Sequence, residues 1–432
     1  MNVLDIAYSL AALVTAPWWM RKTRSGWAER FARVLPELPP KREGVPRIMV
    51  HAVSVGEVNA LRELVPRLAG EADVVVTVST DTGMARAREL FAERCTVARY
   101  PLDGSGAVRR FLDAVRPDAV GLVELELWPN FVRECVARSI PVAVINGRLS
   151  ERSFLGYRRI RRWISPAFAS LSVAAVQDGA YAERFCAMGV PADRVALTGS
   201  MKFDSSRIED DVEGAAELAA ALGIDRAGLL VVAGSTGPGE EALLHAACQR
   251  ASEIVGREVQ LLCAPRKPER FEEAARALPG CARRTVPSGS AGSARSRFLL
   301  DTLGELRQAY SLADVAVVGR SFFDQHGSDP IEPIALGCPT IIGPAVSDFA
   351  EIVRVLEEAS GLVRTDRDDL CGVIAGLLGD ARRREDLVAN GRQCIRGLQG
   401  ASARHLELLM WLAVSGGAAH AAGAGGVVAR PG

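Results

Sequence analysis

Glutamates at two turns in the N-terminal half have the residue types and spacing for acid–base chemistry. Glu57 ends the run Ser54-Val-Gly-Glu, where an apolar stretch stops, a glycine permits a tight turn and a helix is expected to follow. A carboxylate there is either a helix N-terminal cap or a general base aimed into a cleft. Glu124 and Glu126 are two residues apart at the end of another predicted strand, where their side chains share one face. Such a pair binds a cationic or hydroxylated group, or it marks a strand end at the surface.

Arginines and aromatic residues are interleaved in the segment FLGYRRIRRWI, which follows NGRLSERS. The apolar members recur at helical intervals: Phe154, Tyr157, Ile160, Trp163 and Ile164. Four arginines stand among them: Arg158, Arg159, Arg161 and Arg162. A basic helix with aromatic residues suits an anionic membrane surface or a phosphorylated lipid. The alternative is a solvated basic face on a helix that packs against the domain.

Turns with phosphate-binding character follow four predicted strands of the C-terminal half. The glycine-rich run 234–240 offers backbone N–H groups to a phosphate, although it lacks the GK[ST] ending of a P-loop. The run 265–270, PRKPER, supplies cations that neutralise phosphate. The runs 301–305 and 326–333 end a strand and open a helix, respectively. Together the four turns predict a nucleotide site.

Short apolar runs that alternate with amphipathic helical stretches must position these residues. Predicted strands of the first half cover residues 47–53, 74–79, 119–124 and 142–147. Those of the second half cover residues 231–235, 259–264, 298–302, 315–319, 340–343 and 362–365. Val, Ile and Leu runs of this kind indicate parallel strands buried on both faces, and repeated βα alternation indicates doubly wound sheets. We therefore expect an α/β protein of two Rossmann-like domains that face each other across a cleft, with a seam in the polar stretch 201–214.

The composition excludes several classes of protein. The 432 residues include 52 Lys and Arg against 52 Asp and Glu, with 48% hydrophobic and 24% charged residues. These values exclude a disordered chain, a collagen and a multi-span transporter, and the neutral balance argues against a nucleic-acid binder. The nine cysteines are scattered without a CxxC pair, and the five histidines lack metal-ligand spacing. We expect free thiols in a reducing compartment and no metal site.

The two ends of the chain differ from the rest. Residues 6–20 are apolar, but the run is shorter than a comfortable bilayer span and has no signal-peptide cleavage site. Trp18 and Trp19 stand near its end, and residues 21–47 contain eight basic against three acidic residues. This pattern predicts an N-terminal anchor with the body of the protein on the cytoplasmic side, and the alternative is an apolar helix packed on the domain. The glycine-rich last stretch predicts a disordered tail.

Taken in order, these segments resemble the 3-deoxy-D-manno-octulosonic acid (Kdo) transferases of lipopolysaccharide synthesis. The matching pieces follow the family's order from residue 27 to residue 350: WAERF, SVGE, ELELWPN, NGRLSERS, TGSMKFD, GSTGPGEE, APRKPERF, DTLGEL and PIEPIALG. The resemblance implies an inverting GT-B glycosyltransferase that moves Kdo from CMP-Kdo to the lipid A precursor, lipid IVA. It also implies an N-terminally anchored enzyme at the cytoplasmic face of the inner membrane.

The resemblance divides the chain into four parts. Residues 1–26 would form the membrane anchor and residues 27–205 the Rossmann-like acceptor-binding domain. Residues 206–414 would form the Rossmann-like CMP-sugar-binding domain, and residues 415–432 the disordered tail.

The resemblance also gives individual residues a role. Glu57 would be the proton acceptor, and Glu126 and Lys202 would stabilise the transition state. Nine residues would bind CMP: Pro265, Arg266, Leu303, Gly304, Glu305, Asp329, Pro330, Ile331 and Glu332. The four arginines at 158, 159, 161 and 162 would contact the acceptor or an anionic membrane. The family's reaction implies no metal and no other cofactor, because positive potential suffices for a leaving CMP phosphate.

One segment departs from the family's pattern. The family's usual Gly-Gly-His-Asn reads His-Gly-Ser-Asp here, so that Ser328 and Asp329 replace a histidine and an asparagine. An acid near the CMP phosphate would repel it, unless Asp329 caps the helix or faces the ribose. The departure keeps open a GT-B enzyme with a different nucleotide sugar or acceptor. A GT-B-like nucleotide-sugar epimerase and a non-catalytic lipid-binding relative are further alternatives.

Overall fold

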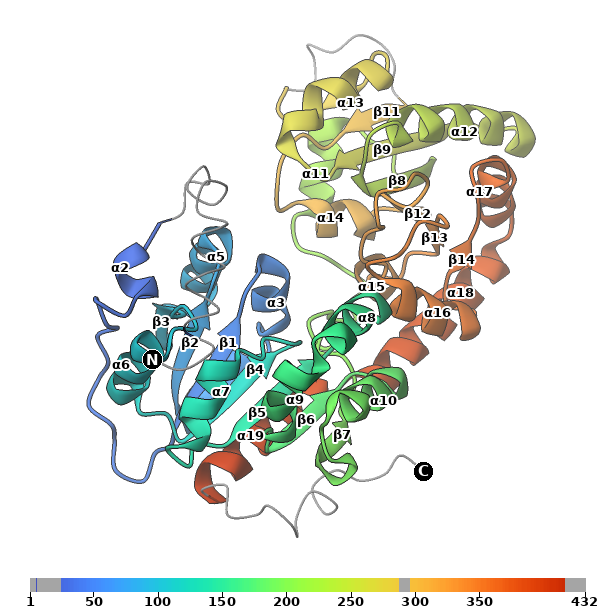
Figure 1. Ribbon diagram of the computed structural model, residues 1–432. Coiled ribbons are helices and arrows are strands. Elements are labelled where there is room, and N and C mark those ends of the chain that lie inside the picture. The colour runs from blue at the N-terminus through green and yellow to red at the C-terminus, as the bar shows by residue number, and fades with distance from the viewer. Residues whose placement is uncertain (1–4, 6–24, 287–295, 416–432) are drawn as a thin grey trace. The chain divides into compact units, whose positions relative to one another are not determined.

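The structure is a computed structural model that describes Asp5, residues 25–286 and residues 296–415. Two compact units make up the fold (Figure 1). The first contains the chain up to Ser205 and returns from Leu398 onward, and the second contains Ser206–Gly397. Each unit is a parallel α/β domain, so the prediction of two Rossmann-like domains is confirmed.

Seven parallel strands form the sheet of the first unit, in the order β3-β2-β1-β4-β5-β6-β7. Their bounds are β1 Arg47–Ala52, β2 Asp73–Val78, β3 Thr96–Arg99, β4 Ala119–Val123, β5 Val142–Gly147, β6 Val173–Val176 and β7 Val195–Leu197. Successive side chains of a strand point to opposite faces, and both faces are buried. In β1, Ile48 and Val50 belong to one apolar cluster and Met49 to the other.

Helices cover both faces of this first sheet. One cluster takes side chains from α3 Val55–Ala60, α4 Leu64–Glu71, α5 Asp81–Phe91 and α19 Ala401–Ser415. The opposite cluster takes them from α6 Ser105–Val115, α7 Pro129–Val136, α9 Arg161–Ala169 and α10 Gly179–Met188. The unit also contains α2 Trp27–Arg30 and α8 Glu151–Arg159. Strands buried on both faces explain the near-continuous apolar runs in the sequence.

A second sheet of seven parallel strands has the order β10-β11-β9-β8-β12-β13-β14. Its strands are β8 Leu229–Thr236, β9 Val259–Pro265, β10 Ala282–Arg283, β11 Arg297–Leu299, β12 Val315–Val318, β13 Thr340–Ile342 and β14 Val363–Arg364. Its helices are α11 Ala215–Leu222, α12 Glu240–Val255, α13 Phe271–Ala277, α14 Leu306–Ser311, α15 Ile331–Ala335, α16 Ala350–Glu358, α17 Leu370–Gly379 and α18 Ala381–Leu398. Helices α12 and α17 bury one face of this sheet, and α11 and α14 bury the other.

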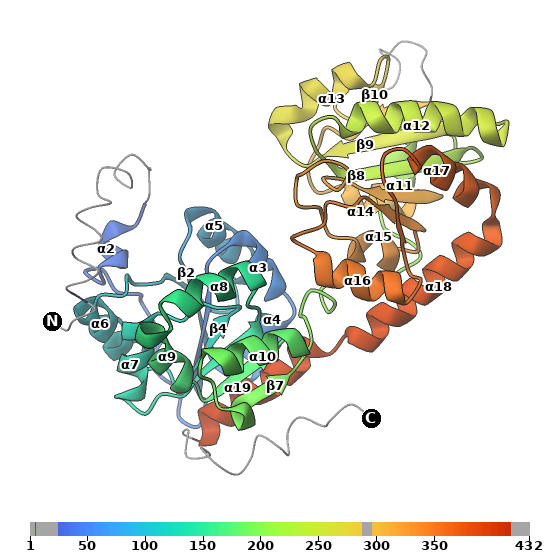
Figure 2. The same ribbon diagram turned by 45° about the vertical axis from the view of Figure 1, so that its right-hand side comes forward.

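Helix α19 corrects the expected extent of the C-terminal domain, which the sequence analysis carried through residue 414. The ribbon of α19 lies among the elements of the first unit in both views (Figures 1 and 2). Its Leu408, Leu409 and Leu412 are buried in the cluster that also contains β1 and β4. Gly121 of β4 makes the room, since a Cβ there would lie 3.1 Å from Cδ2 of Leu409. An apolar stripe on a helix fits any apolar sheet face, so the sequence pattern did not reveal which sheet it covers.

All ten predicted strands are present, and four short ones, β3, β6, β7 and β10, were not predicted. The predicted anchor at 1–26 lies almost entirely outside the described residues, and so does the predicted tail after Ser415. Across residues 25–286 and 296–415, none of the helices combines the length and the apolar content that crossing a bilayer requires. The nine cysteines are free thiols, and five of them are buried.

Candidate active site

The strand order of each sheet reverses at one point, and several of the predicted site residues follow the strands at these two switch points. In the first sheet β1 lies between β2 and β4, and in the second β8 lies between β9 and β12. A crevice forms outside the carboxyl ends of the strands at such a point, and ligands bind there. Glu57 follows β1, and Glu124 and Glu126 follow β4, so all three residues flank the first switch point.

Glu57 lies in the first turn of α3, where Ser54 is the N-cap. The carboxylate accepts hydrogen bonds from the backbone N–H of Val53 and from the hydroxyl of Ser54, both at 2.8 Å. Burial, with a smaller contribution from the nearby Glu124 and Glu126, raises the pKa of Glu57 to about 7. A carboxylate has about four acceptor positions, so two remain for a substrate proton. Glu57 is thus both a capping residue and a half-buried base with a pKa near neutral pH.

Glu124 and Glu126 lie in a turn rather than on one face of a strand, because β4 ends at Val123. Glu124 has a left-handed backbone with φ of 57°, which turns the chain out of the sheet. The indole Nε1 of Trp128 donates to Oε2 of Glu126 at 3.1 Å. Burial raises the pKa of Glu126, as does the charge of Glu124, while the Trp128 bond lowers it. The predicted placement of the two acids on one face of a strand is wrong, but Glu124 is close enough for its charge to raise the pKa of Glu126 and of Glu57.

Lys202 lies in the loop that follows β7, at the same carboxyl edge of the first sheet. The preceding Met201 donates its backbone N–H to Oδ1 of Asn146 at 3.0 Å. On the other side, Asp204 accepts from the backbone N–H of Gly400 at 2.6 Å and from that of Ser402. The loop that carries Lys202 is therefore held between the end of β5 and the first turn of α19. Its distance from the reacting atoms stays a prediction.

Asn146 and His405 support this edge, and the sequence analysis assigned neither of them a role. Asn146 is buried in a left-handed conformation with φ of 51°, and its backbone N–H donates to Nε2 of His405 at 3.1 Å. Burial lowers the pKa of His405 to about 3, which keeps the ring neutral and able to accept. The two residues are 259 positions apart in the chain. Asn146 stands in the NGRLSERS motif, but the contact with α19 left no signal in the sequence.

Two cavities adjoin the turns that carry Glu57 and Glu126. One has a volume of about 340 Å³ and is lined by Val53, whose N–H binds Glu57, and by polar side chains. These include Arg30, Ser79, Asp81 and Asp103, with Trp128 at the side. The second has a volume of about 360 Å³, is mostly apolar and is lined by Glu126 and again by Trp128. Both cavities have more apolar than polar lining surface, and Trp128 lines both of them.

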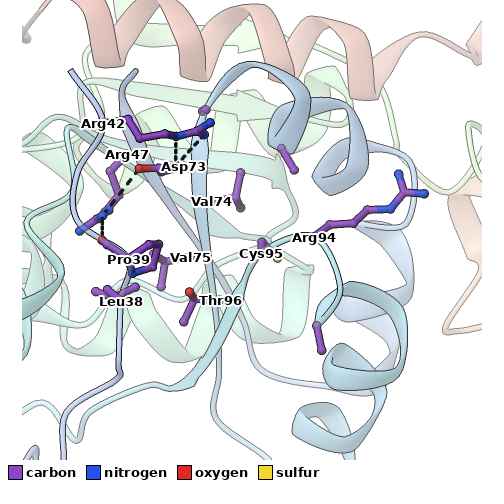
Figure 3. A pocket seen from close by; sticks show the side chains of 13 residues that line it. Leu38, Pro39, Arg42, Arg47, Asp73, Val74, Val75, Arg94, Cys95 and Thr96 are labelled. Carbon is purple, nitrogen blue, oxygen red and sulfur yellow. Dashed lines mark hydrogen bonds and ion pairs between the residues drawn. The ribbon is translucent and has the colours of Figure 1, made fainter. Parts of the chain in front are cut away.

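A further cavity of about 290 Å³ lies at the opposite edge of the first sheet, where β1, β2 and β3 begin (Figure 3). Ion pairs form its wall, since Asp73 pairs with Arg42 at 2.8 Å and with Arg47 at 3.7 Å. The guanidinium of Arg47 also donates to the carbonyls of Pro39 and Val115. These paired charges join the amino ends of the strands, and none of the predicted site residues lines this cavity.

The basic aromatic segment forms two helices rather than one. Ile160 ends α8 and begins α9, so the four arginines flank the break between the helices. Arg158, Arg159, Arg161 and Arg162 are exposed, and among the described residues none of them forms an ion pair with an acid. This exposure fits both the predicted lipid-binding surface and the alternative of a solvated basic face, so the ligand of the four arginines stays a prediction.

At the second switch point a glutamate binds the protein's own backbone. Glu240 begins α12, and its carboxylate accepts from the N–H groups of Gly237, Arg320, Ser321 and Phe322 at 2.6–3.0 Å. Burial raises the pKa of Glu240 despite these four bonds, which lower it. The glycine-rich run 234–240 therefore uses the Gly237 N–H to bind Glu240, and the carboxylate joins the turns after β8 and β12. That N–H was expected to be offered to a phosphate.

The cations after β9 divide into an exposed and a buried set. Pro265 ends β9, and Arg266 and Lys267 follow with exposed side chains. Arg270 instead forms a bidentate pair with the buried Glu241, with both N–O distances at 2.9 Å. Arg266 and Lys267 are therefore available to an anion, whereas Arg270 fixes the start of α13.

The DTLGE turn after β11 presents Leu303 and a structural glutamate. Leu303 is 70% exposed, and Gly304 has a left-handed φ of 93°. Glu305 accepts from Nε and Nη2 of Arg284 at 3.0 and 2.9 Å and from the hydroxyl of Thr302. This carboxylate is already neutralised by a cation, so it would not repel a nearby phosphate.

Asp329 lies just before α15, whose N-cap residue is Pro330. Oδ1 of Asp329 accepts from the N–H of Ile331, the first residue of α15, at 2.9 Å. This hydrogen bond joins the acid to the start of the helix, and a contact of Asp329 with the ribose stays a prediction. The buried hydroxyl of Ser328 has no hydrogen-bond partner among the described residues. Glu332 lies 3.8 Å from the guanidinium of Arg307.

The predicted residues thus form two groups, each at the carboxyl edge of its own sheet. Glu57, Glu126 and Lys202 belong to the first unit, and all nine predicted CMP-binding residues belong to the second. Over the described parts of the chain, no cluster of three or more His, Cys, Asp or Glu side chains could hold a metal ion.

Comparison with known proteins gives the family. The family model described as 3-deoxy-D-manno-octulosonic-acid transferase (kdotransferase) matches residues 25–205. The 3-deoxy-D-manno-octulosonic acid transferase of Bordetella pertussis is 32% identical over 423 residues, covering 93% of this chain and 97% of the relative. That of Haemophilus influenzae is 31% identical over 370 residues, covering 84% and 86%.

Solved structures with the same fold include nucleotide-sugar enzymes of low sequence identity. A UDP-GlcNAc 2-epimerase from Neisseria meningitidis bound to UDP-GlcNAc has a TM-score of 0.55 at 12% identity, covering 84% of this chain and all of its own. Anabaena HepE in complex with UDP has a TM-score of 0.58 at 11% identity, with coverages of 86% and 100%. At these identities the likeness concerns the fold alone.

Proposed function

The chain belongs to the Kdo transferases, glycosyltransferases of lipopolysaccharide biosynthesis, and we propose that it transfers Kdo from CMP-Kdo to the phosphorylated, acylated lipid A precursor with inversion. One observation carries the chemical part of the proposal. Glu57 is a half-buried carboxylate at a switch point, with two acceptor positions left and a pKa of about 7. A base with that pKa removes a proton from a hydroxyl close to neutral pH.

In the proposed reaction the acceptor hydroxyl lies against Glu57. Glu57 takes the hydroxyl proton as the oxygen attacks the anomeric carbon of Kdo. The bond from that carbon to the CMP phosphate breaks, and its electron pair leaves with the phosphate oxygen. Attack opposite to the leaving group in a single displacement inverts the anomeric carbon. Holding both substrates in this geometry supplies much of the rate enhancement.

Charged side chains would assist each end of this displacement. The side chains of Lys202 and Glu126 would stabilise the charge that develops in the transition state. Arg266, exposed after β9, would neutralise the leaving phosphate, assisted by Pro265 and the turns 303–305 and 329–332. The GT-B arrangement of two domains across a cleft is part of this proposal.

Attachment to a membrane is proposed for the N-terminal segment and for the basic surface of α8 and α9. Arg158, Arg159, Arg161 and Arg162 are exposed cations beside exposed apolar side chains, a combination that suits an anionic lipid surface or a lipid phosphate. With this attachment the enzyme would act at the cytoplasmic face of the inner membrane.

Mass spectrometry of the product tests the proposal most directly. Purified protein with CMP-Kdo and the tetraacylated, bisphosphorylated glucosamine disaccharide should yield the acceptor plus one or more Kdo units. Titration calorimetry should show binding of CMP and much weaker binding of UDP and GDP. No added Kdo, together with tighter binding of UDP or GDP, would favour a different nucleotide sugar.

A further inference from the structure

The apolar cavity beside Glu126 is a groove in the first unit whose apolar side chains have no part in the proposed transfer step. It has a volume of about 360 Å³, within the range of small-molecule sites. Six apolar or aromatic side chains from three segments form most of it: Leu127, Trp128, Tyr157, Ile160, Trp163 and Ile164. Leu127 and Ile164 are buried and form its floor.

The rim of this groove exposes large apolar side chains to solvent. Trp163 is 68% exposed, Ile160 49% and Trp128 40%. The local sequence causes this, because α8 ends and α9 begins at Ile160, and the break turns Ile160 and Trp163 away from the core. A contiguous exposed apolar patch of this kind marks a surface that binds an apolar partner.

Positive charge surrounds the apolar rim. Arg158 and Arg159 precede Ile160, and Arg161 and Arg162 follow it. All four are exposed and lack an acidic partner among the described residues. Elsewhere in the unit an arginine such as Arg99 is neutralised by an acid, in that case Asp81 at 2.7 Å. A ligand that complements the whole surface is therefore apolar in one part and anionic in another.

The groove is continuous with the proposed catalytic turn. Glu126 lines it, and the Glu126 carboxylate accepts the indole N–H of Trp128 at 3.1 Å. Trp128 also lines the cavity of about 340 Å³, whose lining includes Val53, the residue that donates to Glu57. A ligand with a sugar beside Glu57 and a hydrocarbon chain beyond Trp128 would fill both cavities.

We propose that this groove binds one fatty acyl chain of the acceptor, with Trp128 separating the chain from the sugar and the four arginines contacting the acceptor's phosphate. The inference rests on the proposed function, in which the acceptor is an acylated glycosyl phosphate. Contact of the chain with the apolar rim removes apolar surface from water, so Ile160 and Trp163 together should add about tenfold or more in affinity. The groove therefore selects acylated over deacylated acceptors.

A pair of acceptors tests this selection. The double variant Ile160→Ser, Trp163→Ser is assayed in detergent micelles with the tetraacylated acceptor and with the same bisphosphorylated disaccharide after complete deacylation. The KM for the acylated acceptor, divided by the KM for the deacylated acceptor, should rise about tenfold or more in the double variant. Ile254→Ser in α12 of the other unit is the matched control, because Ile254 is 64% exposed and lies outside the groove. An unchanged ratio in the double variant would overturn the proposal.

A binding measurement separates the groove from the reaction and from the bilayer. Monomeric dodecyl phosphate below its micelle concentration should bind the wild type at least about tenfold more tightly than the double variant, while inorganic phosphate should bind both equally. If only partition onto vesicles of phosphatidylglycerol and phosphatidylethanolamine falls, the patch contacts the bilayer and the acyl groove is wrong. If dodecyl phosphate binds as expected but no acceptor receives Kdo, the proposed function fails and the groove stands.

Discussion

Each of the two switch points carries a glutamate in the first turn of the helix that follows the innermost strand of its sheet. Glu57 follows β1 and Glu240 follows β8, and burial raises the pKa of both carboxyl groups. They differ in their partners. Glu240 accepts four backbone N–H groups from two turns, whereas Glu57 accepts one backbone N–H and one hydroxyl from its own turn.

This difference separates a structural carboxylate from an available one. With about four acceptor positions on a carboxylate, Glu240 is saturated and Glu57 is half used. Burial and a raised pKa, which the two share, do not identify the base; the unused acceptor positions do. Three of the four predictions that follow test this distinction, and the fourth tests a cation of the second unit.

The largest expected effect is on the rate of Glu57→Gln. The amide keeps the size of the side chain and one acceptor oxygen but cannot take a proton, so kcat for Kdo transfer should fall by about 10²–10⁴. Thermal unfolding should change little, because the amide can still accept from Val53 and bond to Ser54. Full activity in this variant would remove Glu57 as the base.

Glu240→Gln should lower the stability of the protein, whereas Glu57→Gln should lower its rate. An amide oxygen offers about two acceptor positions, so at least two of the four buried N–H groups lose their partner, and each such loss costs about 1–3 kcal/mol. The free energy of unfolding of the second unit, measured in urea, should fall by about 3 kcal/mol. A variant as stable as the wild type, assayed in parallel with Glu57→Gln, would refute the saturated role of Glu240.

The pH dependence should distinguish rate from stability at Glu57. Because the base must be ionised and its pKa is about 7, kcat/KM should rise with pH and be about tenfold below its plateau at pH 6. The raised pKa means that the folded state holds this proton more tightly than the unfolded chain, whose value is 4.5. Its contribution to stability is therefore present below pH 4.5 and is lost as the pH rises through 7.

The same pH series on Glu57→Gln gives the control for that prediction. The substitution itself can change the unfolding free energy by an amount that does not depend on pH. Beyond that constant amount, the wild type should lose stability relative to Glu57→Gln as the pH rises from 4.5 to 7. A difference that stays constant over this range would show that the pKa of Glu57 is not raised.

The smallest effect is expected at the exposed cation of the second unit. Arg266→Gln removes one positive charge from a solvated position, so KM for CMP-Kdo should rise by about fivefold to tenfold with little change in kcat. Steady-state kinetics at saturating acceptor measure this change. Arg276→Gln in α13 serves as the matched control, because Arg276 is also exposed and its guanidinium donates to the carbonyl of Glu272. Equal KM values for both variants would exclude Arg266 from the donor site.

The fold was largely predictable because strands buried on both faces have continuous Val, Ile and Leu runs. The strands that escaped prediction are short: β3 covers four residues and contains two polar side chains, and β10 covers two. Their position comes from pairing with β2 and with β11, which a local pattern does not encode. The packing of α19 on the first sheet was not predicted for a related reason. Its partner Gly121 lies far earlier in the chain, and its apolar stripe is compatible with either sheet.

The positions of the site residues at strand ends were predictable from the sequence, but the roles of some of these residues were not. Residues after β1, β4, β9 and β11 were placed at strand ends, and the structure has them there. The structural role of Glu240 was not predictable from the sequence. A glycine-rich turn followed by a glutamate has the same composition whether its N–H groups bind a phosphate or that glutamate's carboxylate. Only the positions of the N–H groups of Arg320, Ser321 and Phe322, some 80 residues away, distinguish the two.

The return of α19 to the first sheet has a consequence for the order of synthesis. The second unit leaves the ribosome whole before α19 emerges, and domains generally fold as they are made. The face of the β1–β7 sheet around Gly121 therefore stays uncovered, and Asn146 stays without His405, until α19 has been synthesised. A nascent chain stalled before residue 398 would contain every predicted catalytic and CMP-binding residue but would lack the two hydrogen bonds that Asp204, beside Lys202, accepts from Gly400 and Ser402.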